Sequence, residues 1–444
     1  MFSMEKQAKI LELRGYRRVR MDDESYKNYL DILKEELVPA MGCTEPIAIA
    51  YAAAKARDVL GREPDRVRIE ASDNIIKNVK SVVVPNTGNF RGIEAAAAAG
   101  IVAGDATQVL EVISSVDEEG RRGIKTFLEN REIKVCKTRS DLIFDLVVTL
   151  FSGESEASVR ISHFHTHIVL ITKDGEILYQ NRDCDEIEKS GLMDRSFMNV
   201  MDILEFAEAV DLSRVKDLLD RQIEYNTRIA EEGLKGNWGA NIGSILLETW
   251  GNDIKIRAKA MAAAGSDARM SGCELPVVIV SGSGNQGITA SVPVIEYAKE
   301  LGAERETLLR ALVVSNLTTI HQKTGIGRLS AYCGAVCAGV GAGAGITWLH
   351  GGRFREVAHT IVNALATVSG IICDGAKPSC AAKIASSVDA GILGFHMFQK
   401  GYQFYGGDGI VKKGVENTIA NIGRLGRDGM RETDKEIIRM MLGE

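Results

Sequence analysis

The stretch "AYCGAVCAGVGAGAGITWL", residues 331–349, determines how most of this chain is expected to fold. It carries no charged side chain over nearly the length that a bilayer requires, yet glycine and alanine dominate it. Small residues let neighbouring backbones approach closely, and they recur here at Gly339, Gly341, Gly343 and Gly345. We therefore expect a tightly packed interior helix or loop and no membrane span, since the chain offers no second candidate.

The composition narrows the class of protein. The chain has 444 residues, of which 45% are hydrophobic, and a net charge of -6. This length predicts two or three domains, and the mildly acidic balance argues against nucleic-acid and anionic-membrane partners. The first twenty residues lack the apolar run and cleavage site of a signal peptide, which predicts a cytoplasmic protein. Eight cysteines in that compartment are candidates for metal binding or catalysis rather than for disulfides.

Hydrophobic periodicity divides the chain into three zones. Residues 1–62 contain two helices, "DESYKNYLDILKEEL" and "IAIAYAAAKARDVLG", which are expected to pack on the third zone. Residues 63–190 alternate as strands do, around one Ala-rich helix at 92–104, and residues 191–444 are helical apart from one possible strand in "LPVVIVSGSGNQG". The predicted fold class is α+β, a mainly helical domain with a smaller mixed α/β domain inserted after the N-terminal helices. The strands expected in the second zone are "RVRIEAS", "SVVVP", "EIKVC", "DLVVTLF", "ASVRISHFHTHIVLIT" and "EILYQ".

Three cysteines of the helical zone form a candidate ligand set. Cys373 and Cys380 enclose "CDGAKPSC", a segment that Gly375 and Pro378 break so that both thiols can face one point, and Cys333 precedes the Gly-rich stretch. Structural zinc usually takes four ligands from paired short spacings, which are absent here. Three thiolates suit an iron-sulfur cluster with one open iron, which acts as a Lewis acid. The alternative is that these are buried free thiols, and Cys337 is a rival ligand.

A fourth thiol stands in "MGCTEP", residues 41–46. Cys43 precedes a helix that Thr44 or Glu45 is expected to cap and that carries Pro46 in its first turn. The free N–H groups and dipole of a helix N-terminus favour a thiolate, so Cys43 is a candidate base or metal ligand. An inert cysteine before a helix is the alternative.

The segment "GSGNQG", residues 282–287, matches a dinucleotide-binding pattern after the apolar run "VVIV". The next segment is helical rather than a second strand, so a nest of backbone N–H groups for a small anion fits better. Such a nest would hold a substrate carboxylate with the polar side chains Ser281, Ser283, Asn285 and Gln286. Further candidates for contact with substrate or cluster are His321, Lys323 and Arg328, for which solvated helix-end charges are the alternative.

The run "HFHTH" places His163, His165 and His167 on one face of a predicted strand, a spacing that metal-binding strands use. No carboxylate or cysteine lies nearby in the sequence to complete a site. We therefore interpret the run as the polar face of a half-exposed strand and expect no second metal.

Four motifs in order, "MGCTEP", "SGSGNQG", "HQKTGIGRLSAYCGA" and "CDGAKPSC", resemble those of the L-cysteine desulfidase family, relatives of the alpha chain of iron-sulfur L-serine dehydratase. The resemblance extends from about residue 22 to residue 430. It implies that Cys333, Cys373 and Cys380 hold a [4Fe-4S] cluster and that Cys43 approaches the fourth iron. It also implies a helical cluster domain beside a smaller α+β domain.

The expected function is elimination of sulfide from L-cysteine, which requires a base for the Cα proton and an electrophile for the leaving sulfur. Cys43 as thiolate is the expected base, the open iron the electrophile, and pyruvate, ammonia and hydrogen sulfide the products. L-Serine is the alternative substrate. Two rival functions remain, a pyridoxal-phosphate lyase, which would leave the three thiols without a role, and a cluster-based redox or cysteine sensor that does not turn over. Abundant Gly and Ala on helix faces favour a homodimer.

Overall fold

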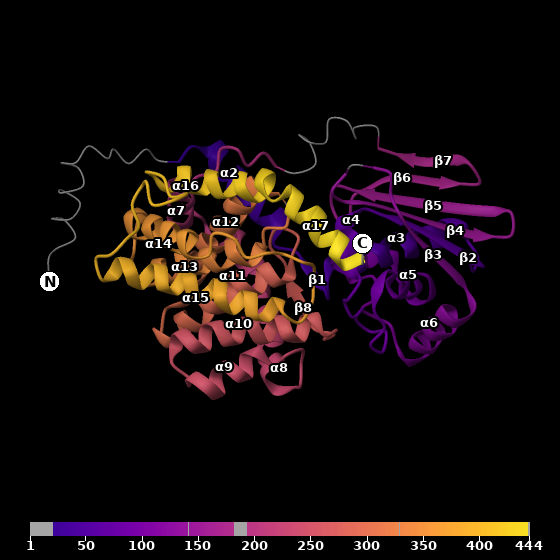
Figure 1. The fold of residues 1–444 in the computed structure, drawn as a ribbon, viewed down its shortest axis with the longest axis horizontal. Coiled ribbons are helices and arrows are strands. Elements are labelled where there is room, and N and C mark those ends of the chain that lie inside the picture. The colour runs from indigo at the N-terminus through magenta and orange to yellow at the C-terminus, as the bar shows by residue number, and fades with distance from the viewer. Residues whose placement is uncertain (1–20, 141, 182–192, 328, 443–444) are drawn as a thin grey trace.

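The computed structural model describes residues 21–140, 142–181, 193–327 and 329–442. Its elements form a mainly helical part and a smaller part built on a six-stranded sheet, side by side in Figure 1. The predicted α+β class is confirmed. The helical part contains α2 (Asp23–Glu36), α7 (Val200–Ala209), η3 (Leu212–Arg214), α8 (Lys216–Lys235), α9 (Ile242–Trp250), α10 (Ile254–Met270), α11 (Gly284–Glu300), α12 (Arg305–Ile326), α13 (Gly334–Leu349), α14 (Phe354–Thr367), α15 (Cys380–Gln399), α16 (Val415–Arg424), η4 (Leu425–Gly429) and α17 (Arg431–Leu442).

Helix α13, the Gly-rich stretch, forms the centre of the helical part. Every residue from 335 to 348 is buried, and the helix packs against α11, α12, α14 and α15. Its small residues set the spacing, because a Cβ at Gly341 would lie 2.1 Å from Thr319 Oγ1 of α12. On the α15 side, a Cβ at Gly343 would lie 2.8 Å from the Cα of Gly391. The expected interior helix is confirmed, and no helix among the described residues is long and apolar enough to cross a membrane.

The sheet of the smaller part has the strand order β3-β2-β4-β5-β6-β7, in which only β2 and β3 run parallel. Burial alternates along β2, β4 and β5, so one face of the sheet is covered, and α3 packs on β4 and β5 there. The elements are α3 (Thr44–Leu60), β2 (Arg66–Ala71), α4 (Asp73–Val79), α5 (Gly92–Ala103), η1 (Ala106–Glu111), α6 (Glu118–Asn130), β3 (Glu132–Lys137), β4 (Asp145–Ser152), β5 (Ser155–Ser162), β6 (Ile168–Lys173) and β7 (Glu176–Gln180).

The two N-terminal helices pack on different parts. Helix α2 contacts α7 and α12 of the helical part, as expected, whereas α3 packs on the sheet and on α5. An Ala-rich helix buried on nearly all sides carries no polar face that would indicate its neighbour. The expectation that both helices pack on the helical domain is therefore wrong for α3, and the domain limits themselves stay predictions.

Three further local predictions differ from the structure. The run "SVVVP" forms no strand and makes a single bridge between Val83 and Arg91. Helix α6, which the sequence reading did not anticipate, packs on α5. The run "HFHTH" is a turn between β5 and β6, because His163 adopts a φ of 67° that ends the strand.

A short antiparallel pair joins the two halves of the chain. Strand β1 (Pro39–Met41) pairs with β8 (Pro276–Val278), so that Ala40 lies opposite Val277. The strand expected in "LPVVIVSGSGNQG" is thus present, although it is only three residues long. This pairing brings the segment before Cys43 alongside the segment before Ser281.

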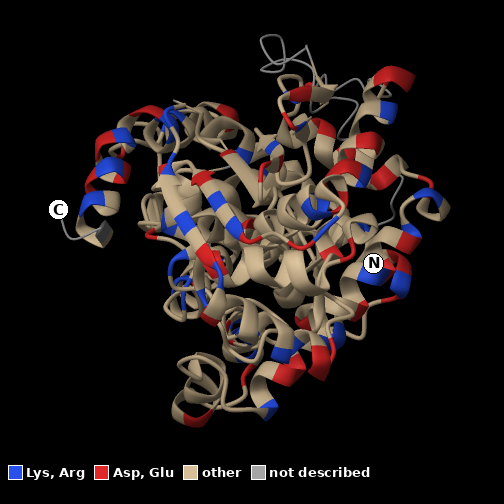
Figure 2. Ribbon diagram, turned by 90° about the vertical axis from the view of Figure 1, so that its right-hand side faces the viewer, with Lys and Arg blue, Asp and Glu red and all other residues tan. Residues whose placement is uncertain are grey.

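Helix α17 extends from the helical part to α4 of the smaller part, and both signs of charge alternate along it in Figure 2. Lys77 of α4 is buried, and its Nζ lies 2.5 Å from Asp434 Oδ1 of α17. Lys80 Nζ donates to the carbonyl of Met441 at 2.6 Å. Lys77 of α4 and Lys80, the residue that follows α4, therefore hold this helix across the boundary between the parts.

Substitution of Gly391 by alanine tests the close packing of α13 and α15. The added Cβ would lie 2.3 Å from the backbone oxygen of Gly339, so the helices must separate, and we expect a loss of about 1–3 kcal/mol in the free energy of unfolding. Chemical denaturation measures this loss. Ser386→Ala, at an exposed position of the same helix, is the control and should change stability by less than about 0.5 kcal/mol. Equal stability of the two variants would contradict the packing argument.

Candidate functional site

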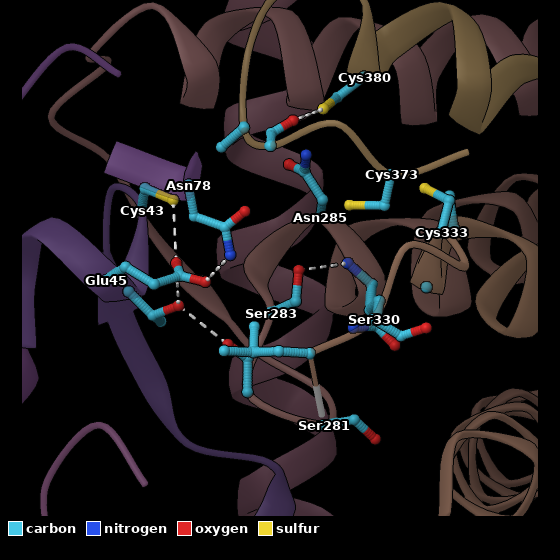
Figure 3. A pocket seen from close by; sticks show the side chains of 18 of the residues that line it. Cys43, Glu45, Asn78, Ser281, Ser283, Asn285, Ser330, Cys333, Cys373 and Cys380 are labelled. Atoms are coloured by element: carbon cyan, nitrogen blue, oxygen red, sulfur yellow. Dashed lines mark hydrogen bonds between the residues drawn. The ribbon is translucent and has the colours of Figure 1, made fainter. Parts of the chain in front are cut away.

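A cavity of about 110 Å³ lies where the two parts of the protein meet. Its walls come from the beginning of α3, from α4, from the turn after β5, from the end of α10, from the beginning of α11 and from the segments that precede α13 and α15. Of the cysteines in the described part of the chain, four line it, namely Cys43, Cys333, Cys373 and Cys380. The structure therefore brings together the four thiols that the sequence singled out (Figure 3).

Backbone pairing places Cys333 beside Cys373. Tyr332 and Ile372 form an isolated antiparallel bridge, in which Cys333 N donates to Ile371 O at 2.9 Å and Cys373 N donates to Ala331 O at 2.7 Å. The two segments are 40 positions apart in the chain, 373 minus 333. Their sulfurs lie next to one another in Figure 3.

Cys380 is the first residue of α15 and is brought back to the cavity by the turn before it. Gly375 adopts a φ of 91°, which only glycine accepts readily, and the Cys380 thiol lies 3.7 Å from the Gly375 carbonyl oxygen. The carboxylate of Asp374 pairs with Lys377 and with Lys383, which holds the turn to the helix. The kink inferred from Gly375 and Pro378 thus directs both thiols into one cavity.

The thiols of Cys333 and Cys373 shift each other's pKa in opposite directions. A hydrogen bond from Cys333 lowers the pKa of Cys373 to about 5, although burial opposes this. The same hydrogen bond, together with burial, raises the pKa of Cys333 well above its ordinary value. Burial also raises the pKa of Cys380. The pair therefore favours one thiolate before any ligand is present.

The chemistry of these thiols limits the group they could hold. Soft thiolates are ligands for zinc and for iron-sulfur clusters. Within the described ranges, no three His, Cys, Asp or Glu side chains form a ready-made site for a single metal ion.

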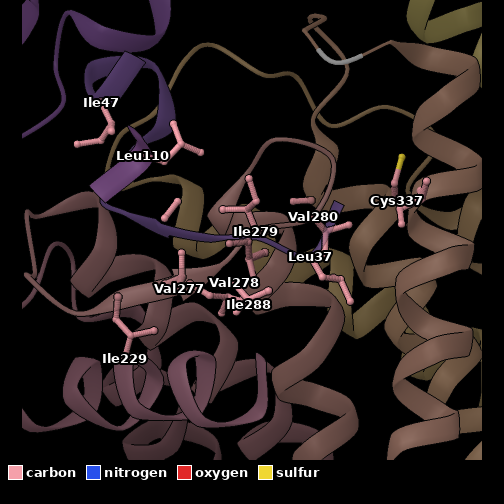
Figure 4. Packing of buried hydrophobic residues seen from close by; sticks show 14 of the residues in the cluster. Leu37, Ile47, Leu110, Ile229, Val277, Val278, Ile279, Val280, Ile288 and Cys337 are labelled. Atoms are coloured by element: carbon pink, nitrogen blue, oxygen red, sulfur yellow. The ribbon is translucent and has the colours of Figure 1, made fainter. Parts of the chain in front are cut away.

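Cys337, the rival ligand, lies elsewhere. It is fully buried, belongs to the hydrophobic core in Figure 4, and does not line the cavity. Burial raises its pKa to about 11. Cys337 is therefore a small core residue.

Cys43 stands at the N-cap of α3, yet its thiol is protonated. Its Sγ donates to Glu45 Oε2 at 3.3 Å (Figure 3), and Thr44 and Glu45 are the first helical residues rather than caps. Burial raises the pKa of Cys43 and the charge of Glu45 raises it further, whereas Arg269 and the backbone N–H of Glu45 lower it. The predicted lowering by the helix terminus is wrong, because burial and an adjacent carboxylate outweigh the helix dipole.

Glu45 is a buried carboxylate that several donors hold in place. Asn78 Nδ2 donates to it at 2.9 Å and Cys43 Sγ at 3.3 Å, while Thr44 Oγ1 lies 3.2 Å from its Oε2. His165 Nε2 lies 3.9 Å from Glu45 Oε1, an ion-pair distance rather than a hydrogen bond. Burial alone would raise its pKa, but His165 and the donors bring the pKa of Glu45 down to about 2. Glu45 is therefore an anion at neutral pH.

The loop "SGSGNQG" forms a wall of the cavity beside the beginning of α3. All four of its predicted residues, Ser281, Ser283, Asn285 and Gln286, line the cavity, and the Ser283 side chain caps α11. Thr44 Oγ1 donates to the Gly282 carbonyl at 2.9 Å, which joins the loop to α3. A helix N-terminus facing a small cavity suits a carboxylate, and the single strand β8 before it is not the strand of a dinucleotide fold.

The three residues predicted from "HQKTGIGR" have different positions. Lys323 is buried and lines the cavity. His321 does not line it, because its Nε2 lies 2.7 Å from Glu416 Oε2 of α16. Arg328 lies outside the described residues. Of these three residues, Lys323 is therefore the one that the structure places at the cavity, where it could contact a substrate.

Sequence reasoning missed several residues of the cavity. His165 reaches it from the turn after β5, Asn78 and Lys77 from α4, and Arg269 from the end of α10. Among these, only His165 belonged to a noticed motif, and it was placed on a strand. The others stand singly in helices, where no spacing marks them. Glu45, within "MGCTEP", was considered only as a cap.

Comparisons with known proteins agree with these motifs. Residues 94–439 match the family model described as serine dehydratase alpha chain. A UPF0597 protein of Desulfitobacterium hafniense is 64% identical over 422 residues, which cover 95% of this chain and 98% of the relative. UPF0597 proteins of Lachnoclostridium phytofermentans and Treponema denticola are 54% and 48% identical and cover 94% and 95% of this chain, and 100% and 99% of their own lengths.

The pair between Lys77 and Asp434 should stabilise the wall of the cavity that α4 provides. The Lys77 side chain is only 1% exposed, so Asp434→Asn would leave a buried charge unpaired, and we expect a loss of about 3 kcal/mol in the free energy of unfolding, measured by urea denaturation. Glu432→Gln on the same helix removes an exposed pair and should cost less than about 1 kcal/mol. Similar losses for both variants would show that α17 does not depend on this pair.

Proposed function

The chain belongs to the serine dehydratase alpha chain family, and we propose that it is a lyase that eliminates sulfide from L-cysteine to give pyruvate, ammonia and hydrogen sulfide. The relation to the alpha chain of serine dehydratase, which the sequence motifs predict, is confirmed at the level of the family. The observation that carries the proposal is the convergence of four cysteines, from opposite ends of the chain, on one cavity between the two parts.

The donor set fits a [4Fe-4S] cluster held by Cys333, Cys373 and Cys380. The three thiols line one cavity, soft thiolates suit iron-sulfur clusters, and the pair Cys333 and Cys373 favours a thiolate. When bound, such a cluster supplies an open iron that acts as a Lewis acid toward the leaving sulfur.

The beginning of α11 would bind the substrate carboxylate. Its first backbone N–H groups are available to an anion, with Ser281, Ser283, Asn285 and Gln286 around them. The Gln286 side chain lies over Gly334, the residue after Cys333, since a Cβ there would be 2.5 Å from Gln286 Cδ. A substrate held by its carboxylate in this loop would therefore have its side chain within reach of the thiols.

Cys43 would remove the Cα proton from the other side of the cavity. Its thiol is neutral at rest and donates to Glu45 Oε2, so it must lose that proton before it can act as a base. The Glu45 carboxylate accepts the hydrogen bond of this thiol, and Asn78 fixes the orientation of that carboxylate. Breaking the Cα–H and Cβ–S bonds leaves aminoacrylate, which water converts to pyruvate and ammonia, while the sulfur departs as sulfide.

L-Serine is the second candidate substrate, and the family match favours it. Cysteine and serine differ by one atom, and both present a leaving group at Cβ. A soft sulfur is the better ligand for iron, which favours cysteine. We keep cysteine as the proposed substrate for this reason.

Anaerobic assay of both amino acids on reconstituted protein tests the function. We expect release of sulfide and pyruvate from cysteine and slower formation of pyruvate from serine. Cys43→Ala should reduce turnover at least about 100-fold, because it removes the base, while cysteine still binds. Faster turnover of serine would reassign the substrate, and a Cys43→Ala variant with most of the wild-type activity would show that another residue is the base.

Reconstitution of the cluster tests the ligand set separately from turnover. The protein should take up about four irons and four sulfides per chain, and Cys333→Ala, Cys373→Ala and Cys380→Ala should each lose this capacity. Cys337→Ala is the matched control, because Cys337 lies in the core away from the cavity, and it should load normally. Stoichiometric zinc in anaerobically purified protein, or normal loading of the three variants, would contradict the assignment.

A further inference from the structure

A buried guanidinium lines the cavity, and it has no acidic partner among the residues that the structure describes. Arg269, in the last turn of α10, is 3% exposed, and none of the ion pairs found among the described residues includes it. Its Nη1 donates to the neutral oxygen Asn285 Oδ1 at 3.1 Å, and its Nε is buried with no hydrogen-bond partner. A buried charge normally carries a counter-ion, because removal of a guanidinium from water is costly.

The same guanidinium lies against the N-terminus of a long helix. A Cβ at Gly284, the first residue of the 17-residue α11, would be 2.3 Å from Arg269 Nε and 2.7 Å from its Cζ. The free N–H groups and the dipole of that helix are also positive. Two positive features therefore meet at one wall of the cavity, and only an anion would satisfy both.

The other cations of the cavity are already engaged. Lys77 pairs with Asp434, and Lys323 also interacts with other groups of the chain. Arg269 is thus the cation at this wall whose described contacts leave room for an incoming carboxylate. A guanidinium presents donors in a planar fork, which matches the two oxygens of a carboxylate.

We propose that Arg269 binds the α-carboxylate of the amino-acid substrate, together with the first turn of α11. This inference rests on the proposed function and adds the residue that selects for it. Arg269 contacts Asn285, and the next residue, Met270, packs with Cys43. A carboxylate held here orients Cα toward Cys43 and the side chain toward the three thiols. The site would therefore accept α-amino acids and discriminate against amines that lack the carboxylate.

Comparison of L-cysteine with cysteamine, which is cysteine without its carboxylate, tests this role. Both ligands are titrated calorimetrically into reconstituted protein carrying Cys43→Ala, which we expect to bind without turnover. Cysteine should bind roughly 10- to 100-fold more tightly than cysteamine, and adding Arg269→Gln should weaken cysteine by that factor and leave cysteamine unchanged. Arg269→Lys should lie between the two. Arg257→Gln, which changes an arginine of the same helix that does not line the cavity, should have no effect.

The outcomes separate this inference from the proposed function. Equal binding of cysteine and cysteamine, or a preference that survives Arg269→Gln, would overturn the role of Arg269 without a bearing on turnover. In the assay with Cys43 present, Arg269→Gln should raise KM for cysteine by the same factor, and an unchanged KM would also overturn it. If Arg269→Gln does not fold, the two ligands compared on protein with Arg269 intact, and on Arg269→Lys, decide the question. Failure of the wild type to release sulfide or pyruvate would instead reject the proposed function.

Discussion

The site depends on one short piece of backbone pairing, the bridge between Tyr332 and Ile372. Its two hydrogen bonds join the segment before α13 to the segment before α15, and they place Cys333 and Cys373 side by side. Helix α13 cannot shift and so cannot move Cys333, because it is buried on all sides and its glycines contact both α12 and α15 closely. The rigid centre of the helical part therefore determines where the thiols lie, and the turn at Gly375 adds Cys380.

A second pairing performs the same task on the opposite wall. Strands β1 and β8 align the segments that lead into α3 and α11, which brings Cys43 and the Ser283 cap to one cavity, and the hydrogen bond from Thr44 to Gly282 fastens them. The reactive and polar side chains on this side of the cavity thus lie at the beginnings of two helices, and two short paired strands hold those helices in place. Helix beginnings expose free N–H groups, so the same arrangement that gathers the thiols also provides a binding wall for an anion.

Much of this architecture was predictable, and the misses have physical causes. Helices α2, α3 and α5 agree with their periodicity or composition, and the three-thiol set followed from a Gly-Pro kink between Cys373 and Cys380. The histidines of "HFHTH" alternate as in a strand, but the positive φ of His163 turns the chain, which no residue type there announces. The direction of the Cys43 pKa could not be predicted, because the sequence does not show that Glu45 turns back onto the thiol in a buried setting. Arg269 belongs to no motif in the sequence. Its proposed role depends on the beginning of α11 at Gly284, fifteen positions later, which packs against its guanidinium.

The bond between Lys77 and Asp434 spans 357 positions of the chain and has a consequence for biosynthesis. Because α4 leaves the ribosome long before α17, Lys77 must remain without this partner during most of translation. The wall of the cavity that α4 provides therefore gains its contact with α17 only after the last residues of the chain have been made.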